Sequence, residues 1–188
     1  MSTPVRDRPD TRSALLAAAG ALLREGGAAA LTLRAIGARA GVSRQAPYLH
    51  FPSKEALLAA LAADGFDQLS AEVDAAREGT EVPLEAMSAA YVRFAFEDPH
   101  RYRLMFGSDA EGRRASIVAE KARELGARFV AAFEVGSPQS LIDPLGAATV
   151  LYAASHGAVD LVLGEEPKET ALTPMGVIRT VLALLGAR

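Results

Sequence analysis

Residues 30 to 58 read ALTLRAIGARAGVSRQAPYLHFPSKEALL, a segment with signals for two short helices joined by a minimal turn. Thr32 is a strong N-cap residue, which predicts a helix that starts there and ends near residue 40. Gly41 follows at a position where a chain leaving a helix commonly adopts a left-handed backbone. Ser43 is a second N-cap residue and predicts another helix over about residues 44–50.

The spacing of Gly37, Gly41 and Pro47 is typical of a helix-turn-helix. A small residue stands where the helices cross, a glycine follows four residues later in the turn, and an apolar plug follows six residues after that. Many helical proteins that never touch DNA contain a similar pair of helices. The spacing alone therefore leaves DNA binding and plain structural packing both open.

The polar side chains of this segment favour DNA binding. Arg44 and Tyr48 are four residues apart and share a face of the second helix, with Gln45 beside them. Arginine and glutamine carry forked donors that match the edges of guanine and adenine. Groups suited to phosphate oxygens surround them: Thr32, Ser43, Tyr48, His50 and Lys54. Two structural alternatives stay open, partial burial of Tyr48 and a capping role for His50 at the helix end.

Charge is distributed unevenly along the chain. Residues 1–54 carry eight Lys or Arg against three acidic residues, a net +5, whereas the whole chain has a formal net charge of -3. A basic first third on an acidic remainder suits a head that faces phosphates, although a solvated surface can have the same distribution.

The rest of the sequence predicts an all-α protein, because Ala and Leu are abundant and no alternating strand pattern occurs. We expect a flexible arm (1–11), a three-helix helix-turn-helix DNA-binding domain (12–58) and a helical effector-binding and dimerisation domain (59–188). Punctuation by proline and glycine predicts nine helices, at about 12–25, 33–40, 44–50, from 54 onward, 83–97, 99–106, 110–134, 140–163 and 171–186.

Composition excludes several classes of protein. The chain has no cysteine, hence no disulfide framework or thiolate metal site, and no signal-peptide pattern, so we expect a cytoplasmic protein. His156 and Asp160 interrupt the longest apolar stretch, 145–163, which favours a buried helix over a membrane span. We expect no membrane partner.

Little in the sequence supports an enzyme. The histidines His50, His100 and His156 have no metal-ligand spacing, and no phosphate loop or nucleophile elbow occurs, so we expect no metal and no cofactor. Glu165, Glu166 and Glu169 cluster between prolines, as in a solvated loop. An enzyme, or a helical adaptor that kept the helix-turn-helix shape without binding DNA, remains the alternative to a regulator.

Residues 30–43 and 48–58 together resemble the DNA-binding head of the TetR family of transcriptional regulators. The resemblance implies that Arg34, Arg44, Gln45 and Ala46 face bases. It implies phosphate contacts by Thr32, Ser43, Tyr48, His50 and Lys54. Gly37 stands where alanine is typical of the family, and Pro47 stands where leucine is typical. We expect Pro47 to remove only the first hydrogen bond of its helix.

The resemblance also implies a homodimer that binds a near-palindromic operator on double-stranded DNA, because one short helix reads too few base pairs. The last two helices are the expected dimer surface. Their small and apolar stripes, which could equally be core, comprise Ala147, Ala148, Leu151, Ala154 and Ala158, then Leu172, Val177, Val181, Leu182 and Leu185.

Residues 91–107 gather five of the eleven Phe and Tyr residues. A pocket lined by Met87, Tyr91, Phe94, Tyr102 and Met105 would suit a small apolar or aromatic effector, although aromatic residues at helical spacing are more often core.

Residues 155–157 (Ser-His-Gly) are similar to the tryptophan-histidine-glycine (WHG) signature of a TetR subset, with Tyr152 where tryptophan is expected. His156 is either a core histidine or a group that orients the effector. The resemblance implies a repressor that its effector releases from the operator.

Overall fold

The computed structural model describes residues 10–107, 116–136, 142–164 and 173–187, and all regular structure in these ranges is helical. Three helices form one end of the molecule: α1 (Thr11–Gly26), α2 (Leu33–Arg39) and α3 (Ala46–His50), with a short 3₁₀ turn, η1 (Ala28–Ala30), after α1. The all-α expectation of nine α-helices is confirmed for the described part of the chain.

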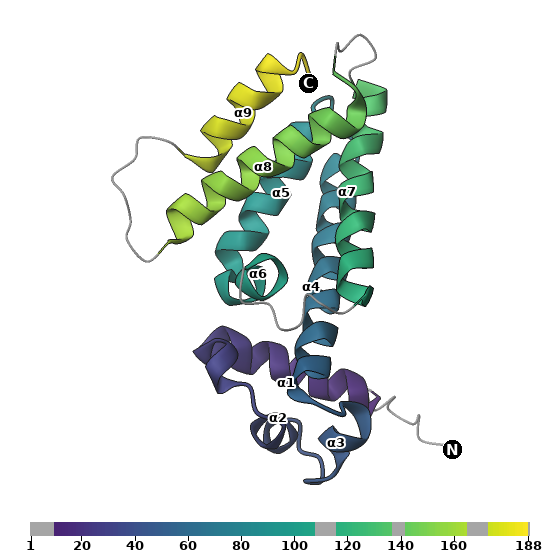
Figure 1. Cartoon of the computed structure of the whole chain (residues 1–188), viewed down its shortest axis with the longest axis vertical. Coiled ribbons are helices and arrows are strands. Elements are labelled where there is room, and N and C mark those ends of the chain that lie inside the picture. The colour runs from purple at the N-terminus through teal and green to yellow at the C-terminus, as the bar shows by residue number, and fades with distance from the viewer. Residues whose placement is uncertain (1–9, 108–115, 137–141, 165–172, 188) are drawn as a thin grey trace, which may run out of the picture.

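The long helix α4 (Lys54–Arg77) runs from this head into the body of the molecule (Figure 1). It packs against α1 in the head and against α5, α6 and α7 in the body, and one continuous apolar core spans both parts. The body consists of α5 (Pro83–Glu97), α6 (Pro99–Phe106), α7 (Ser116–Gly136), α8 (Pro144–Leu163) and α9 (Pro174–Leu184).

Proline and cap residues set most of the helix starts. Four helices of the body begin with proline, whose missing N–H costs nothing in the first turn. The expected helices at 83–97 and 99–106 have the observed bounds. The last two begin later than expected, at Pro144 and Pro174, and the second ends earlier, at Leu184. The helix expected over 110–134 would start within residues 108–115, which lie outside the described residues.

The start of α3 differs from the expectation. The helix begins at Ala46, and Ser43 does not cap it; instead the Ser43 carbonyl accepts a hydrogen bond from the Ala46 N–H at 3.1 Å, inside a turn. Pro47 is therefore the second residue of α3, where an N–H would have no intrahelical acceptor, so the proline removes no helical hydrogen bond.

Helix α8 is not the buried helix that its apolar sequence predicted. One face packs against α5, α7 and α9, while Leu145, Val150 and Leu161 are exposed on the other. Among the described residues, α8 is the helix long and apolar enough to cross a membrane, with a mean hydropathy of 1.3. Core helices of soluble proteins can be equally long and apolar.

The stripe expected to form the dimer surface faces the protomer's own core. Its buried members are Ala147, Ala148, Leu151, Ala158, Leu182 and Leu185, and Ala154, Val177 and Val181 are half-buried. Leu172 lies outside the described residues. The predicted dimer stripe is the inward one because α8 is apolar on both faces, and periodicity does not distinguish the inward face from the outward face.

Candidate DNA-binding and effector sites

The α2–α3 pair has the geometry of a helix-turn-helix. The Thr32 hydroxyl accepts a hydrogen bond from the Ala35 N–H at 3.1 Å and caps α2. Gly41 has φ 68°, a left-handed conformation that lets the chain reverse between the helices. Pro47 is buried against Gly37, where a β-carbon would lie only 2.8 Å from the proline Cγ. The turn glycine and the packing of the two helices agree with the expectations.

The predicted DNA-contacting residues gather on the surface of the head. Those with exposed side chains are Thr32, Arg34, Ser43, Arg44, Gln45, Tyr48, His50 and Lys54, and Ala46 is half-buried. The side chain of Tyr48 is 59% exposed, so the alternative of partial burial is wrong. In Figure 1, α2 and α3 lie at the end of the molecule opposite α9.

The start of α4 joins this surface. Ser53 caps the helix, because its hydroxyl accepts a hydrogen bond from the Ala56 N–H at 3.2 Å, and Lys54 follows in the first turn. The Ser53 hydroxyl also holds the pKa of the neighbouring Glu55 carboxyl below its usual value. The N-terminal end of α4 thus presents Lys54 and the helix N-terminus, which both favour a bound anion, beside the Glu55 carboxylate.

Leu49 is a surface residue of α3 that the sequence reasoning missed, with 83% of its side chain exposed. The available signal was helical spacing, since Leu49 is four residues after Gln45 and two after the apolar plug Pro47.

The predicted effector residues form a packed cluster in the body. Met87, Tyr91, Phe94, Tyr102 and Met105 are all buried. The phenol oxygens of Tyr91 and Tyr102 lie 3.1 and 2.6 Å from Nδ1 of His156, which joins α5, α6 and α8 at one point. Met105 instead lies against Gly65 of α4.

The sequence reasoning missed Phe106 and Asp160 as members of this cluster. The ring of His156 stacks on Tyr152 with centroids 5.4 Å apart, and the ring of Phe106 lies 5.6 Å from it. The Asp160 carboxylate is 3.5 Å from Nε2 of His156. Helical spacing could have pointed to Asp160, which is four residues after His156.

The hydrogen bonds of the cluster run in one direction. When the imidazole proton is on Nε2, facing the Asp160 carboxylate, Nδ1 accepts the hydrogen bond that the Tyr102 hydroxyl donates. The Tyr91 hydroxyl then donates to the Tyr102 oxygen, 3.1 Å away. Burial raises the pKa of both phenols above their usual value. The two tyrosines are thus neutral, and both phenols make hydrogen bonds within the cluster.

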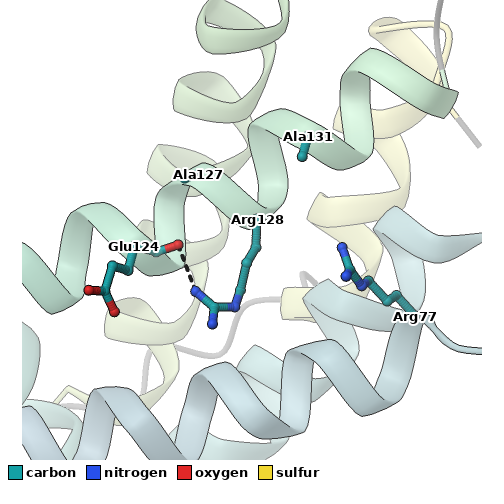
Figure 2. A pocket seen from close by; sticks show the side chains of 5 residues that line it. All are labelled: Arg77, Glu124, Ala127, Arg128 and Ala131. Carbon is teal, nitrogen blue, oxygen red and sulfur yellow. Dashed lines mark hydrogen bonds between the residues drawn. The ribbon is translucent and has the colours of Figure 1, made fainter.

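Two surface hollows lie elsewhere, and no predicted effector residue lines either of them. The hollow in Figure 2, about 420 Å³, lies between α4 and α7 and is lined by Arg77, Glu124, Ala127, Arg128 and Ala131. Both arginines pair with Asp74, at 3.7 and 2.9 Å, and Arg128 also donates to the Glu124 carbonyl. The second hollow, about 500 Å³, lies between α1, α4 and α7. Among the described residues, no group of His, Asp and Glu could hold a metal ion.

A buried cation joins the head to the body. Arg101 of α6 is only 4% exposed, and its guanidinium lies 3.0 Å from Asp64 of α4 and 3.4 Å from Asp98. The guanidinium also lies over Gly20 of α1, where a β-carbon would be 2.6 Å from it. Asp98 in turn lies 3.9 Å from Arg24 of α1.

Two family models match this chain. The first, "Bacterial regulatory proteins, tetR family", covers residues 15–61, which include α2, α3 and the start of α4. The second, "Tetracyclin repressor-like, C-terminal domain", covers residues 84–183, over half of the chain.

Known proteins agree with these matches. HTH-type transcriptional regulator Rv1816 of Mycobacterium tuberculosis is 32% identical over 116 residues, which are 59% of this chain and 49% of that protein. The chain thus spans about half the length of the curated relatives it matches. A solved structure from Rhodococcus sp. RHA1, of unknown function, is 27% identical with a TM-score of 0.80, and the match covers 100% of both chains.

A SmeT–triclosan complex is 26% identical with a TM-score of 0.62, and the match covers 93% of this chain and 90% of that one. Two family models, a curated regulator and solved structures thus agree with the geometry of the head. The chain therefore belongs to the tetR family of bacterial regulatory proteins, which are DNA-binding transcriptional regulators and not enzymes.

Proposed function

We propose that this regulator is a cytoplasmic repressor that reads its operator through the helix-turn-helix formed by α2, the following turn and α3. Arg34, Arg44, Gln45 and Ala46 face bases, and Thr32, Ser43, Tyr48, His50 and Lys54 contact phosphates. The observation that carries this proposal is that these side chains lie together on the surface of a basic head. The proposed domains are the arm 1–11, of which 1–9 lie outside the described residues, the head 12–58 and the body 59–188. Helix α4 crosses the boundary between head and body.

The regulator acts as a homodimer through the outer faces of α8 and α9. These faces expose Leu145, Val150 and Leu161 on α8 and Leu184 on α9, the last at 81%. Burial of these apolar side chains against a second copy would remove them from water. In a twofold dimer the two α3 helices are separated by one helical turn of DNA or by a multiple of it. This arrangement matches a near-palindromic operator.

The effector binds at the cluster around Tyr91, Tyr102 and His156, the part of the chain whose sequence resembles the WHG subset. The SmeT–triclosan complex supports a small apolar or aromatic effector. Because the cluster is packed, the effector must displace some of its side chains to enter. Tyr102 neighbours the head-contacting Arg101, so displacement shifts α6 against α1 and α4 and weakens operator binding through linkage.

Selection of bound sites from random DNA tests operator binding. The expected result is a near-palindrome with two half-sites, and Arg44→Ala and Tyr48→Ala should abolish its enrichment while the fold and the dimer survive. No enrichment with the wild-type protein, or unchanged enrichment with both variants, would contradict the proposal.

Sedimentation of charged variants tests the dimer. Val150→Glu and Leu184→Glu should give monomers with weak operator binding, because each buries a charge in the interface. Val135→Glu is the matched control, since Val135 is 84% exposed on α7 and lies outside the proposed surface. Dimers in both test variants would place the interface elsewhere.

A further inference from the structure

Two adjacent apolar side chains stand out on the surface of the head. Tyr48 and Leu49 are the exposed large hydrophobic residues within residues 10–61, all of which the structure describes. Leu49 is the more exposed of the two, at 83%. A solitary exposed leucine is ordinary on a protein surface. This one lies on α3, the second helix of the helix-turn-helix, which such motifs place in the major groove.

The packing of α3 directs Leu49 away from the protein. Pro47 is the buried residue of α3 and marks the inward face of the helix. Leu49 is two residues after Pro47, which is about 200° around a helix of 3.6 residues per turn. It therefore shares the outward face with Gln45, four residues earlier, whose backbone is also helical.

The chemistry of the major groove leaves one partner for this side chain. Guanine, adenine and cytosine present polar atoms there, and thymine adds the C5-methyl group. We propose that Leu49 reads the methyl group of a thymine in each half-site. This inference rests on the proposed base reading by α3. Gln45 and Leu49 are about 6 Å apart along the helix axis, so the thymine lies within about two base pairs of the base that Gln45 faces.

Replacing thymine with uracil in the selected operator tests the contact, because uracil lacks only that methyl group. One thymine position per half-site should respond, with wild-type affinity falling about fourfold per half-site, the equivalent of ~0.8 kcal/mol for one buried methyl-sized group. Leu49→Ala should bind the thymine operator several-fold more weakly and should not distinguish thymine from uracil. Val135→Ala, an exposed aliphatic truncation on α7, should retain the full thymine preference.

Fluorescence anisotropy with each single uracil substitution gives the affinities, and circular dichroism checks the fold of each variant. Equal losses for wild type and Leu49→Ala at every substituted position would overturn the inference. The inference would also be overturned if no single uracil substitution lowered the affinity of the wild-type protein. These outcomes leave operator binding intact and differ from failure of the proposed function, in which no operator is selected at all.

Discussion

At the scale of single residues, Gly37 and Pro47 are the two positions where the head departs from the usual family pattern, and they compensate each other. A β-carbon on Gly37 would lie 2.8 Å from Cγ of Pro47, closer than van der Waals contact allows. Alanine is normally preferred to glycine inside a helix by roughly 0.5–1 kcal/mol. The missing side chain at Gly37 thus provides the space that the proline ring fills.

Gly37→Ala should lower the free energy of unfolding by about 1 kcal/mol, because overpacking at a well-packed site outweighs the gain in helix propensity. In a Pro47→Ala background the same substitution should become neutral or stabilising, since the ring is gone. Urea unfolding of wild type, both single variants and the double variant measures this cycle. Additive effects would show that the two residues are not coupled.

The buried phenols make a second prediction at this scale. The pKa of Tyr91 and of Tyr102 is raised in the folded protein by burial, whereas an unfolded tyrosine titrates near its usual value of about 10. Above that pH the unfolded state loses protons that the folded state retains, so stability should fall as pH rises. Below about pH 10 the contribution is fully present.

Urea unfolding between pH 8 and about pH 11 measures this loss, and the variant with Tyr91→Phe and Tyr102→Phe should have a shallower decline than wild type. The difference in free energy of unfolding between the two proteins at pH 8 is the internal control, because both phenols are neutral there in the folded and the unfolded state. Parallel declines would mean that these tyrosines do not cause the alkaline loss.

At the scale of elements, two serines that look alike in sequence have different roles. Ser53 caps α4, whereas Ser43 lies in the turn before α3 and its side chain makes no cap to that helix. Because α3 begins at Ala46, the exposed Ser43 hydroxyl is available for the proposed phosphate contact. The head thus has one structural serine and one that faces outward.

Ser53→Ala should lower the free energy of unfolding by about 1 kcal/mol, because it removes a helix cap. Ser43→Ala should change it by less than about 0.5 kcal/mol, as is usual at exposed positions, while operator affinity falls. Each variant is the control for the other in parallel unfolding and anisotropy measurements. Equal loss of stability in both would mean that Ser43 also caps a helix in solution.

At the scale of the whole molecule, α6 connects the head to the effector cluster. Arg101 contacts α1 and α4, and the next residue, Tyr102, contacts His156 of α8. Asp64 and Asp98 neutralise the buried guanidinium. A rearrangement of the cluster therefore reaches the head through one short helix.

Arg101→Leu should destabilise the protein by about 2–4 kcal/mol, because it removes the closer of the two cations beside the nearly buried Asp98. Hydrogen exchange should accelerate in α1 more than in α8 and α9, since the lost contacts join the head to α6. Asp98→Asn in the same chain should restore part of the stability by removing the stranded charge. Uniform acceleration along the chain would contradict a local junction.

The sequence alone determined the helices and the head, because these depend on signals between residues close together in the chain. The cap at Thr32, the turn glycine Gly41 and the prolines that open four helices are such signals. Spacing within one short segment predicted Arg44, Gln45 and Tyr48 as DNA-facing residues, and the family resemblance added Arg34 and Ala46. Their contacts with DNA remain predictions.

Only the tertiary structure decided which apolar faces are inside and which polar groups meet. Periodicity does not orient α8, which is apolar on both faces, and local spacing does not predict that Tyr91, Tyr102 and His156 converge from three helices. The burial of Arg101 and the fit of Pro47 against Gly37 also depend on neighbours from other helices. Such contacts depend on how the helices pack. Packing brings together residues that are far apart in the sequence, and no local pattern relates them.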